Sequence, residues 1–289
     1  MSGFIGDLLE GIADFFIDVW MLRRHRAVKG RPSNRWDDDA AAVVVFNGWG
    51  IAVSVVVLVA SVVLFFVLKL PVWISLLPIA AGAVYVGYEV KAGYAVDPHR
   101  VYVTGISAGG AMTSIMLACY SDVFAAGAIH SGGMYKGATT ISGSAYALLA
   151  GSIYSPDSNG RLAWQCSGSP KPRPLPVLVF HGSADSTVNP INGQQAVRQF
   201  LQTNDLADDG VDNDSVKYVP TSTYRGQVPG GRAYTVDTYA YNGRILAQHY
   251  VVQGMGHAWS GSQSGLPFTD PQGPDATLIT WLFLRDNQR

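Results

Sequence analysis

A serine within a run of small residues is the first position in this sequence whose type and setting suit chemistry. The run is Gly105-Ile106-Ser107-Ala108-Gly109, and it lies between a strand-like segment, Arg100–Thr104, and a helix-like segment that begins at Ala111. A Gly-x-Ser-x-Gly run on a strand-to-helix turn is typical of a nucleophile elbow, which holds the serine hydroxyl exposed above a sheet. The alternative is a tight glycine–serine turn without chemistry.

A serine hydroxyl needs a base to take its proton, and the base is normally a histidine oriented by a carboxylate. Asp185 follows the strand-like run Leu175–His181, and His257 follows the strand-like run Gln248–Gln253. The order serine, aspartate, histidine is that of the α/β-hydrolases. We therefore predict that Ser107 is the nucleophile, His257 the base, and Asp185 the residue that orients His257.

Other polar and aromatic residues near these positions have less specific settings. His181 shares the loop of Asp185, which predicts a structural role, and His249 lies within a strand-like run. His130 ends another such run and is expected to line a substrate pocket or to be hydrogen-bonded. Trp259, next to the base, fits either a pocket wall or simple packing. The acidic segment 205–214 lacks the closing glutamate of a calcium loop, so we expect it to be a solvated loop.

From about residue 91 onward, short apolar runs alternate with helix-like stretches and turn residues. This alternation predicts an α/β fold with a parallel sheet, and residues 135–173 are expected to form a surface excursion rich in Ser, Gly and Pro. The expected strands are Arg100–Thr104, Ala125–His130, Leu175–His181 and Gln248–Gln253, and the expected helices are Ala111–Tyr120, Gly193–Thr203 and Ala276–Leu284.

The first part of the chain has a different chemistry. Residues 1–38 combine an apolar stripe at helical spacing with a cluster of arginines, as in an amphipathic helix on a membrane surface or an ordinary core-facing helix. Residues 40–68 and 70–88 contain no charged residue. We predict one or two transmembrane helices within 39–90, and hence a membrane-anchored protein. The basic cluster places the N-terminus in the cytoplasm. One span would then put the 91–289 region outside, and two would return it to the cytoplasm.

Composition and residue spacing argue against some classes of binding partner. The net charge is −1, with 20 lysines and arginines, so there is no basic excess of the kind that binds nucleic acid. No two cysteines or histidines have the spacing of a zinc site, and the predicted chemistry requires no metal and no cofactor. Cys119 and Cys166 allow one disulfide outside the cytoplasm. We favour the alternative that Cys119, at the end of an apolar helix, is a buried free thiol.

The sequence from about Gly93 to Leu284 resembles the polyhydroxybutyrate depolymerase-like esterases, which are related to feruloyl and acetylxylan esterases. The resemblance lies in residues 94–112 around Ser107, in residues 120–128 and 269–276, and in the motifs His181-Gly-Ser-Ala-Asp185 and Gly254-Met-Gly-His257. It implies an α/β-hydrolase fold, hydrolysis of carboxylic esters, and a Ser107–Asp185–His257 triad. It also implies that the backbone N–H of Ala108 is one oxyanion donor.

The chain departs from this family before the elbow. Family members carry several strands there, with a His-Gly loop that supplies a second oxyanion donor, whereas this chain has its apolar segments. We therefore expect a sheet truncated at its N-terminal strands and no second donor upstream of Ser107. A serine esterase is the leading prediction, with polyhydroxyalkanoate, feruloyl and short acyl esters all open as substrates. The alternatives are a catalytically impaired, membrane-bound interaction module and a serine peptidase.

Overall fold

The computed structural model describes residues 97–167, 173–262 and 266–289, together with positions 59–61, 63, 64, 69 and 78. Within those residues, no helix has both the length and the apolar character needed to cross a bilayer. The amphipathic segment predicted for 1–38 lies outside the described residues. The spans predicted for 40–88 also lie outside them, except for the seven isolated positions, and both remain predictions.

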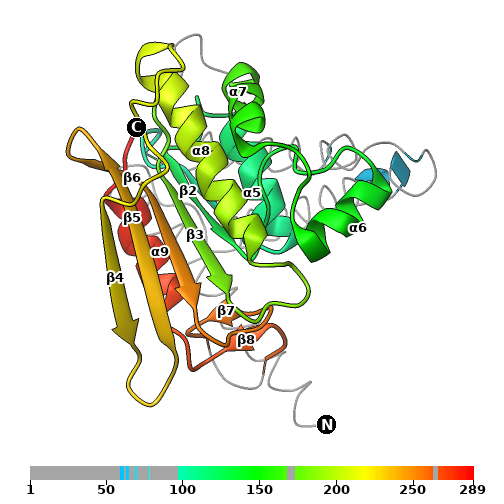
Figure 1. Ribbon diagram of the computed structural model, residues 1–289, viewed down its shortest axis with the longest axis vertical. Helices are drawn as coiled ribbons and strands as arrows, with labels where there is room; N and C mark the ends of the chain where they lie inside the picture. The colour runs from blue at the N-terminus through cyan, green and yellow to red at the C-terminus, as the bar shows by residue number, and fades with distance from the viewer. Residues whose placement is uncertain are drawn as a thin grey trace, which may run out of the picture.

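A six-stranded, mostly parallel sheet forms the centre of the molecule (Figure 1). Its strand order is β1-β2-β3-β6-β5-β4. The parallel strands are β1 (Tyr102–Ile106), β2 (Ala126–His130), β3 (Val177–Gly182) and β6 (Arg244–Val252), and the antiparallel strands are β5 (Ala233–Tyr241) and β4 (Ser222–Gln227). A parallel pair, β7 (Trp259–Ser260) and β8 (Thr269–Asp270), lies apart from this sheet. The predicted α/β class and its parallel sheet are confirmed.

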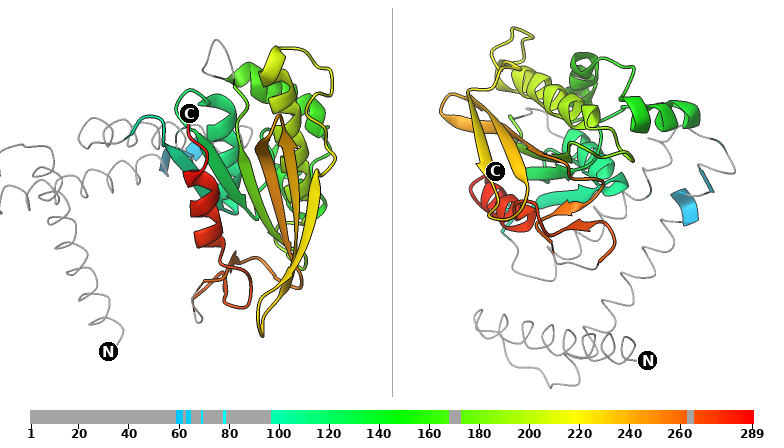
Figure 2. Two further views of the ribbon diagram at one scale, coloured as in Figure 1. Left: turned by 90° about the vertical axis from the view of Figure 1, so that its left-hand side faces the viewer. Right: turned by 60° about the horizontal axis from the view of Figure 1, so that its bottom comes forward.

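Helices cover both faces of the sheet, so the molecule has three layers (Figure 2). One face carries α5 (Ala108–Cys119), α7 (Pro156–Cys166) and α8 (Ile191–Asp209), with α6 (Ile141–Ala150) packed against α8. The other face carries α9 (Ala276–Arg285), which packs against β2 and β3.

Strand β3 shows why the sequence folds this way. All of its residues are buried, and successive side chains point to opposite faces of a strand. Val179 therefore packs in the core beneath α5 and α8, while Leu178 and Phe180 pack in the core beneath α9. A continuous apolar run is the pattern of a parallel strand covered on both sides. The predicted strands at β1, β2, β3 and β6 are confirmed. Strands β1 and β3 begin two residues later than predicted, and β6 begins four residues earlier.

The segment 135–173, predicted to be a surface excursion, contains two helices. Thr140 caps α6, because its side-chain oxygen accepts a hydrogen bond from the Gly143 N–H. Ser155 caps α7 in the same way, and Pro156 occupies its first turn. Both are standard helix-start signals.

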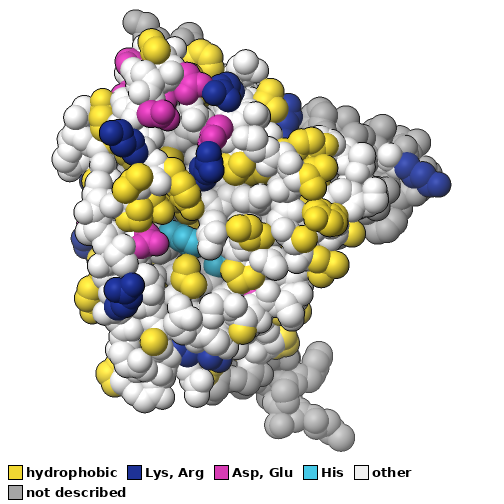
Figure 3. All heavy atoms as spheres, in the orientation of Figure 1, with side chains coloured by type: hydrophobic (Ala, Val, Ile, Leu, Met, Phe, Trp, Pro, Cys, Tyr) yellow, Lys and Arg dark blue, Asp and Glu magenta, His cyan; other side chains and the backbone are white. Residues whose placement is uncertain are grey.

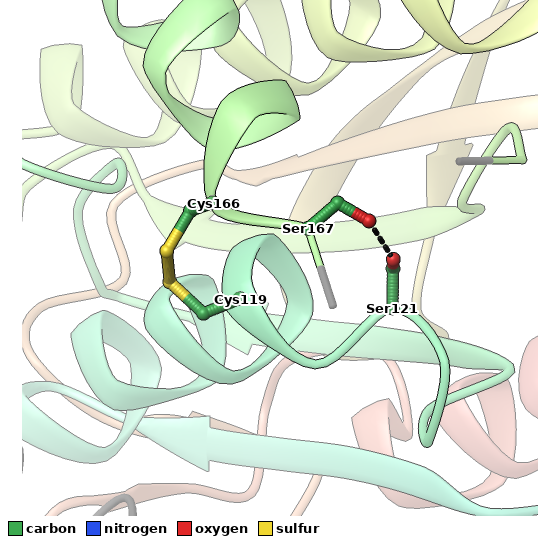
Figure 4. Close-up of a disulfide and its surroundings, with 4 residues drawn as sticks. All are labelled: Cys119, Ser121, Cys166 and Ser167. Carbon is green, nitrogen blue, oxygen red and sulfur yellow. Dashed lines mark hydrogen bonds between the residues drawn. A yellow bond between two sulfur atoms is a disulfide. The ribbon is translucent and has the colours of Figure 1, made fainter. Parts of the chain in front are cut away.

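A disulfide joins Cys119 to Cys166, so the free thiol that we favoured for Cys119 is wrong. The bond links the end of α5 to the end of α7, and a hydrogen bond between Ser121 and Ser167 lies beside it (Figure 4). A free cysteine and a bonded one are both apolar at the end of a helix. Local sequence therefore does not separate the two cases.

The expected solvated loop at 205–214 is also wrong in its first half. Helix α8 continues to Asp209 and ends at Gly210, whose φ of 85° is left-handed. The carboxylate of Asp205 is buried and accepts hydrogen bonds from the backbone N–H groups of Asn213, Asp214 and Val216 and from the Ser215 hydroxyl. A buried carboxylate is stable when its oxygens are hydrogen-bonded in this way.

Candidate active site

Ser107 occupies a strained turn between β1 and α5. Its φ of 58° is in the left-handed region, which is costly for a residue with a side chain. The Ser107 N–H donates to the His130 carbonyl at 2.9 Å, which fixes the turn to the end of β2. Glycine is required beside it, because a Cβ at Gly105 would lie 2.5 Å from the carbonyl carbon of Gly109. The geometry is that of the predicted elbow.

The topology brings the three predicted catalytic residues to one edge of the sheet. Ser107 follows β1, Asp185 follows β3 and His257 follows β6, and these strands run parallel. The carboxyl ends of parallel strands lie at the same edge, where sites in open α/β sheets form.

Asp185 and His257 are directly paired. The His257 Nδ1 lies 2.8 Å from Asp185 Oδ2, and the Asp185 side chain is completely buried. The other carboxylate oxygen accepts the backbone N–H groups of Thr187 and Val188, each at 2.9 Å. A carboxylate only accepts hydrogen bonds, so the Nδ1 of His257 is the donor in this pair, and in the neutral ring the Nε2 is the acceptor. Within the described ranges, no hydrogen bond joins the Ser107 hydroxyl to His257, as is common before substrate binds.

His181 contacts both Asp185 and the loop that holds it. Its Nε2–H donates to the Val188 carbonyl at 2.8 Å, and the same nitrogen lies 3.6 Å from Asp185 Oδ2. Burial lowers the pKa of His181, which favours the neutral form of the ring. The sequence predicted a structural role for this residue, and its contacts are of that kind.

A second buried histidine, His249 on β6, lies close to His181. A Cβ at Gly193 would be 2.8 Å from His181 Nδ1 and 3.2 Å from His249 Nε2, so both rings crowd that glycine. Neither of these two nitrogens has a hydrogen-bond partner in the described part of the chain. Burial lowers the pKa of His249 to about 4.

His130 and Trp259, the predicted pocket residues, stack on each other with their ring centroids 4.8 Å apart. His130 is 2% exposed, and burial lowers its pKa to about 3. Its Nε2 accepts the Ser260 N–H at 3.3 Å, so its Nδ1 carries the proton. The Trp259 indole N–H donates to the Thr277 hydroxyl. Neither residue is among those that line the pocket beside Ser107.

That pocket has a volume of about 290 Å³. Its walls come from the elbow and α5, the segment after β2, helix α6 and the start of α8. The lining residues are Ser107, Ala108, Ala111, Ile115, Gly132, Gly133, Met134, Lys136, Gly137, Ala138, Ser144, Ala147, Leu148, Val188 and Asn192. The sequence led us to expect that residues 135–173 build the pocket, and six of the lining residues lie there. Helix α6 within that segment was missed, although the cap at Thr140 was a readable signal for it.

Within residues 97–167, 173–262 and 266–289 and the isolated positions, no group of three or more His, Cys, Asp or Glu side chains could hold a metal ion. The second oxyanion donor was expected to be missing upstream of Ser107. That stretch lies largely outside the described residues, so the expectation remains a prediction.

A mostly parallel sheet with helices on both faces and a serine elbow at its carboxyl edge defines an α/β-hydrolase-like protein. The resemblance found in the sequence is confirmed, because residues 77–215 match the family described as esterase PHB depolymerase.

Curated relatives carry esterase or depolymerase names. A poly(3-hydroxyalkanoate) depolymerase C from Paucimonas lemoignei is 35% identical over 172 residues, covering 58% of this chain and 37% of that protein. A feruloyl esterase B from Neurospora crassa is 30% identical over 177 residues, covering 60% of this chain and 55% of that protein. The chain thus spans about half or less of the length of these relatives.

Among solved structures, an acetyl xylan esterase from Aspergillus awamori matches with a TM-score of 0.50 at 21% identity. The match covers 62% of this chain and 61% of that one. At this level of identity the likeness shows the fold alone.

Proposed function

We propose that this chain is a serine esterase that hydrolyses carboxylic esters, with Ser107, His257 and Asp185 as its catalytic triad. The observation that carries the proposal is the Asp185–His257 hydrogen bond at 2.8 Å, at the sheet edge that also bears the strained Ser107. Family membership of the matched residues and the names of the relatives support the same reaction class.

The reaction follows from the hydrogen bonds. His257 Nε2 takes the proton of the Ser107 hydroxyl as its oxygen attacks the ester carbonyl carbon. Asp185 stabilises the imidazolium that forms, because its buried carboxylate already faces Nδ1. His257 then gives the proton to the leaving alcohol oxygen, and an acyl group remains on Ser107. Water, activated by the same histidine, releases the acid and restores the serine.

The Ala108 N–H is the proposed oxyanion donor. Ala108 is the first residue of α5, and the first N–H groups of a helix have no partner inside the helix. The helix also presents the positive end of its dipole to this point. Ala108 and Ser107 line the same pocket, which supports this assignment of the donor.

The test is hydrolysis of p-nitrophenyl butyrate by the purified full chain and by Ser107→Ala. Loss of the nucleophile should lower turnover by about 10³-fold or more. Ser158→Ala is the matched control, because Ser158 is an exposed serine on α7 outside the pocket, and it should keep wild-type activity. Equal turnover by Ser107→Ala and wild type would refute the proposal.

A further inference from the structure

The pocket beside Ser107 is largely apolar. Four of its apolar lining residues, Ile115, Met134, Ala147 and Val188, are buried, and most of its other lining residues are alanine or glycine. The described lining contains one charged residue, Lys136, whose ammonium lies 5.5 Å from the centroid of the Tyr135 ring. Lysine stems pack along apolar surfaces while the charged end lies elsewhere, so Lys136 is compatible with an apolar wall.

Apart from Ser107 and Lys136, the polar side chains of the wall, Ser144 and Asn192, donate their hydrogen atoms to groups inside the protein. The Ser144 hydroxyl donates to the Thr140 carbonyl at 2.8 Å. The Asn192 amide donates to the carbonyls of Ala147 and Asn189, at 2.8 and 3.0 Å. A ligand with many hydrogen-bonding groups would therefore lose water without gaining matching donors, which disfavours its binding.

Helix α6 is held in place as a preformed wall. The last carbonyl groups of a helix need partners from outside the helix. The Asn189 N–H donates to the Leu148 carbonyl at 2.7 Å, and the Asn189 side chain donates to the Leu149 carbonyl at 3.0 Å. Asn189 follows the loop of Asp185, so the wall and the catalytic carboxylate are fixed to the same segment.

The apolar character continues beyond the pocket. Leu148, which lines it, is 46% exposed, and Leu149 and Ile153 are 66% and 75% exposed. Hydrophobic side chains gather over α6 and the segment after it on the face seen in Figure 3. An uncharged chain leaving the pocket would meet further apolar surface.

The volume of the pocket limits the size of the chemical group that it can hold. A cavity of about 150 Å³ holds benzene, so about 290 Å³ suits roughly twice as many carbon atoms. An acetyl group would leave most of this space unfilled.

We propose that this pocket binds the acyl part of the ester, and that the preferred acyl group is an uncharged, apolar chain of about six to twelve carbon atoms. This inference rests on the proposed esterase function, because it places the acyl carbonyl at Ser107 and Ala108 and the chain between α5 and α6.

The direct test is a series of p-nitrophenyl esters: acetate, butyrate, hexanoate, octanoate and the adipate half ester. Each buried methylene contributes up to about fourfold, so kcat/KM should rise at least about tenfold from butyrate to octanoate. Hexanoate should exceed the adipate half ester, which has the same length but a terminal carboxylate, by about tenfold or more. A flat or falling series, or a preference for the adipate half ester, would overturn the proposal.

A substitution in the pocket wall tests whether the chain-length preference arises in this pocket. Ala147→Phe fills the α6 wall and should lower the octanoate-to-acetate ratio of kcat/KM at least about tenfold. Ala145→Phe makes the same change at an exposed position of α6 and should keep the wild-type ratio. An unchanged ratio in Ala147→Phe would contradict the placement. The wild-type series remains decisive if Ala147→Phe does not fold.

The two proposals fail in different ways. Ser107-dependent hydrolysis of acetate without a rise toward octanoate refutes the acyl pocket and leaves the esterase intact. The absence of Ser107-dependent hydrolysis for every ester refutes the proposed function.

Discussion

At the scale of single residues, Asp185 connects the proposed base to the loop that follows β3. One of its oxygens faces His257, and the other binds two backbone N–H groups of its own loop. His181 fixes the Val188 peptide from the opposite side. The carboxylate is thus held by three separate groups, and its position sets the ring orientation of the proposed base.

Asp185→Asn tests that role with little change in shape. The amide oxygen can still accept the N–H groups of Thr187 and Val188, but the amide NH₂ would face His257 Nδ1. This reverses the proton position in the imidazole, so kcat on p-nitrophenyl butyrate should fall by about 10³–10⁴ with a small change in KM. Asp157→Asn, which removes only a surface ion pair with Arg198, is the control. A kcat within tenfold of wild type would contradict the role of Asp185.

The buried histidines make stability depend on pH. His130 and His249 have pKa values lowered to about 3 and about 4, whereas histidine titrates near 6.5 in an unfolded chain. Below about pH 6.5 the unfolded state therefore binds more protons than the folded state. The free energy of unfolding should be insensitive to these groups above that pH. It should fall by about 1.4 kcal/mol per histidine per pH unit between roughly pH 6 and 4.

Urea unfolding at pH 7.5, 6, 5 and 4 measures this slope. His249→Leu removes one of the buried rings whose pKa is lowered. The free energy of unfolding of this variant should therefore fall less steeply on acidification than that of wild type, by about 1.4 kcal/mol per pH unit. A variant with the wild-type slope, or a wild type whose stability rises on acidification, would be inconsistent with neutral buried histidines.

At the scale of elements, the site depends on how the segment between β2 and β3 is fastened. Asn189 and Asn192 bind the end of α6, and the disulfide ties α7 to α5. Helix α5 begins directly after Ser107, so the disulfide joins the excursion to the helix that carries the proposed oxyanion donor.

Loss of the disulfide should destabilise the fold. The bond closes a loop with a sequence separation of 47, for which the loop-entropy relation gives about 4 kcal/mol at most. We expect Cys119→Ser/Cys166→Ser to lower the free energy of unfolding in urea by roughly 2–4 kcal/mol. Adding a reductant should shift wild type toward the double variant and leave the double variant unchanged. Insensitivity of wild type to the reductant would argue against the bond.

The sequence predicted those elements whose pattern is local. Strands β2 and β3 are continuous apolar runs, and the elbow is a short motif between a strand and a helix. Helix α6 was missed because its Gly and Ser residues are typical of turns, although its packing on α8 makes it helical. Strand β4 was missed because it is almost entirely exposed and lacks the apolar alternation of a half-buried strand. Strand β5 was also missed, although its tyrosine, threonine and valine residues are typical of a strand and were a readable signal. The segment that builds much of the pocket was expected at 135–173, but the shape of the pocket could not be predicted, since it depends on where α6 docks.

At the scale of the whole molecule, the described part is an α/β-hydrolase-like domain with its proposed catalytic residues at one sheet edge. The chain spans about half or less of the length of the curated relatives named above. Strand β1, which leads into Ser107, forms one edge of the described sheet. Whether the full chain hydrolyses esters is therefore the property that decides if the site is complete. Membrane attachment through 40–88 remains a prediction.

The most direct measurement is labelling of the purified full chain with a fluorophosphonate, followed by peptide mapping. This reagent phosphonylates serines that an adjacent base activates, so it reports the nucleophile without any assumption about substrate. We predict a single adduct on Ser107, its loss in Ser107→Ala, and much slower labelling in His257→Ala. A folded protein that takes up no label, or one labelled at another serine, would contradict the central claim that Ser107 is the nucleophile of an esterase.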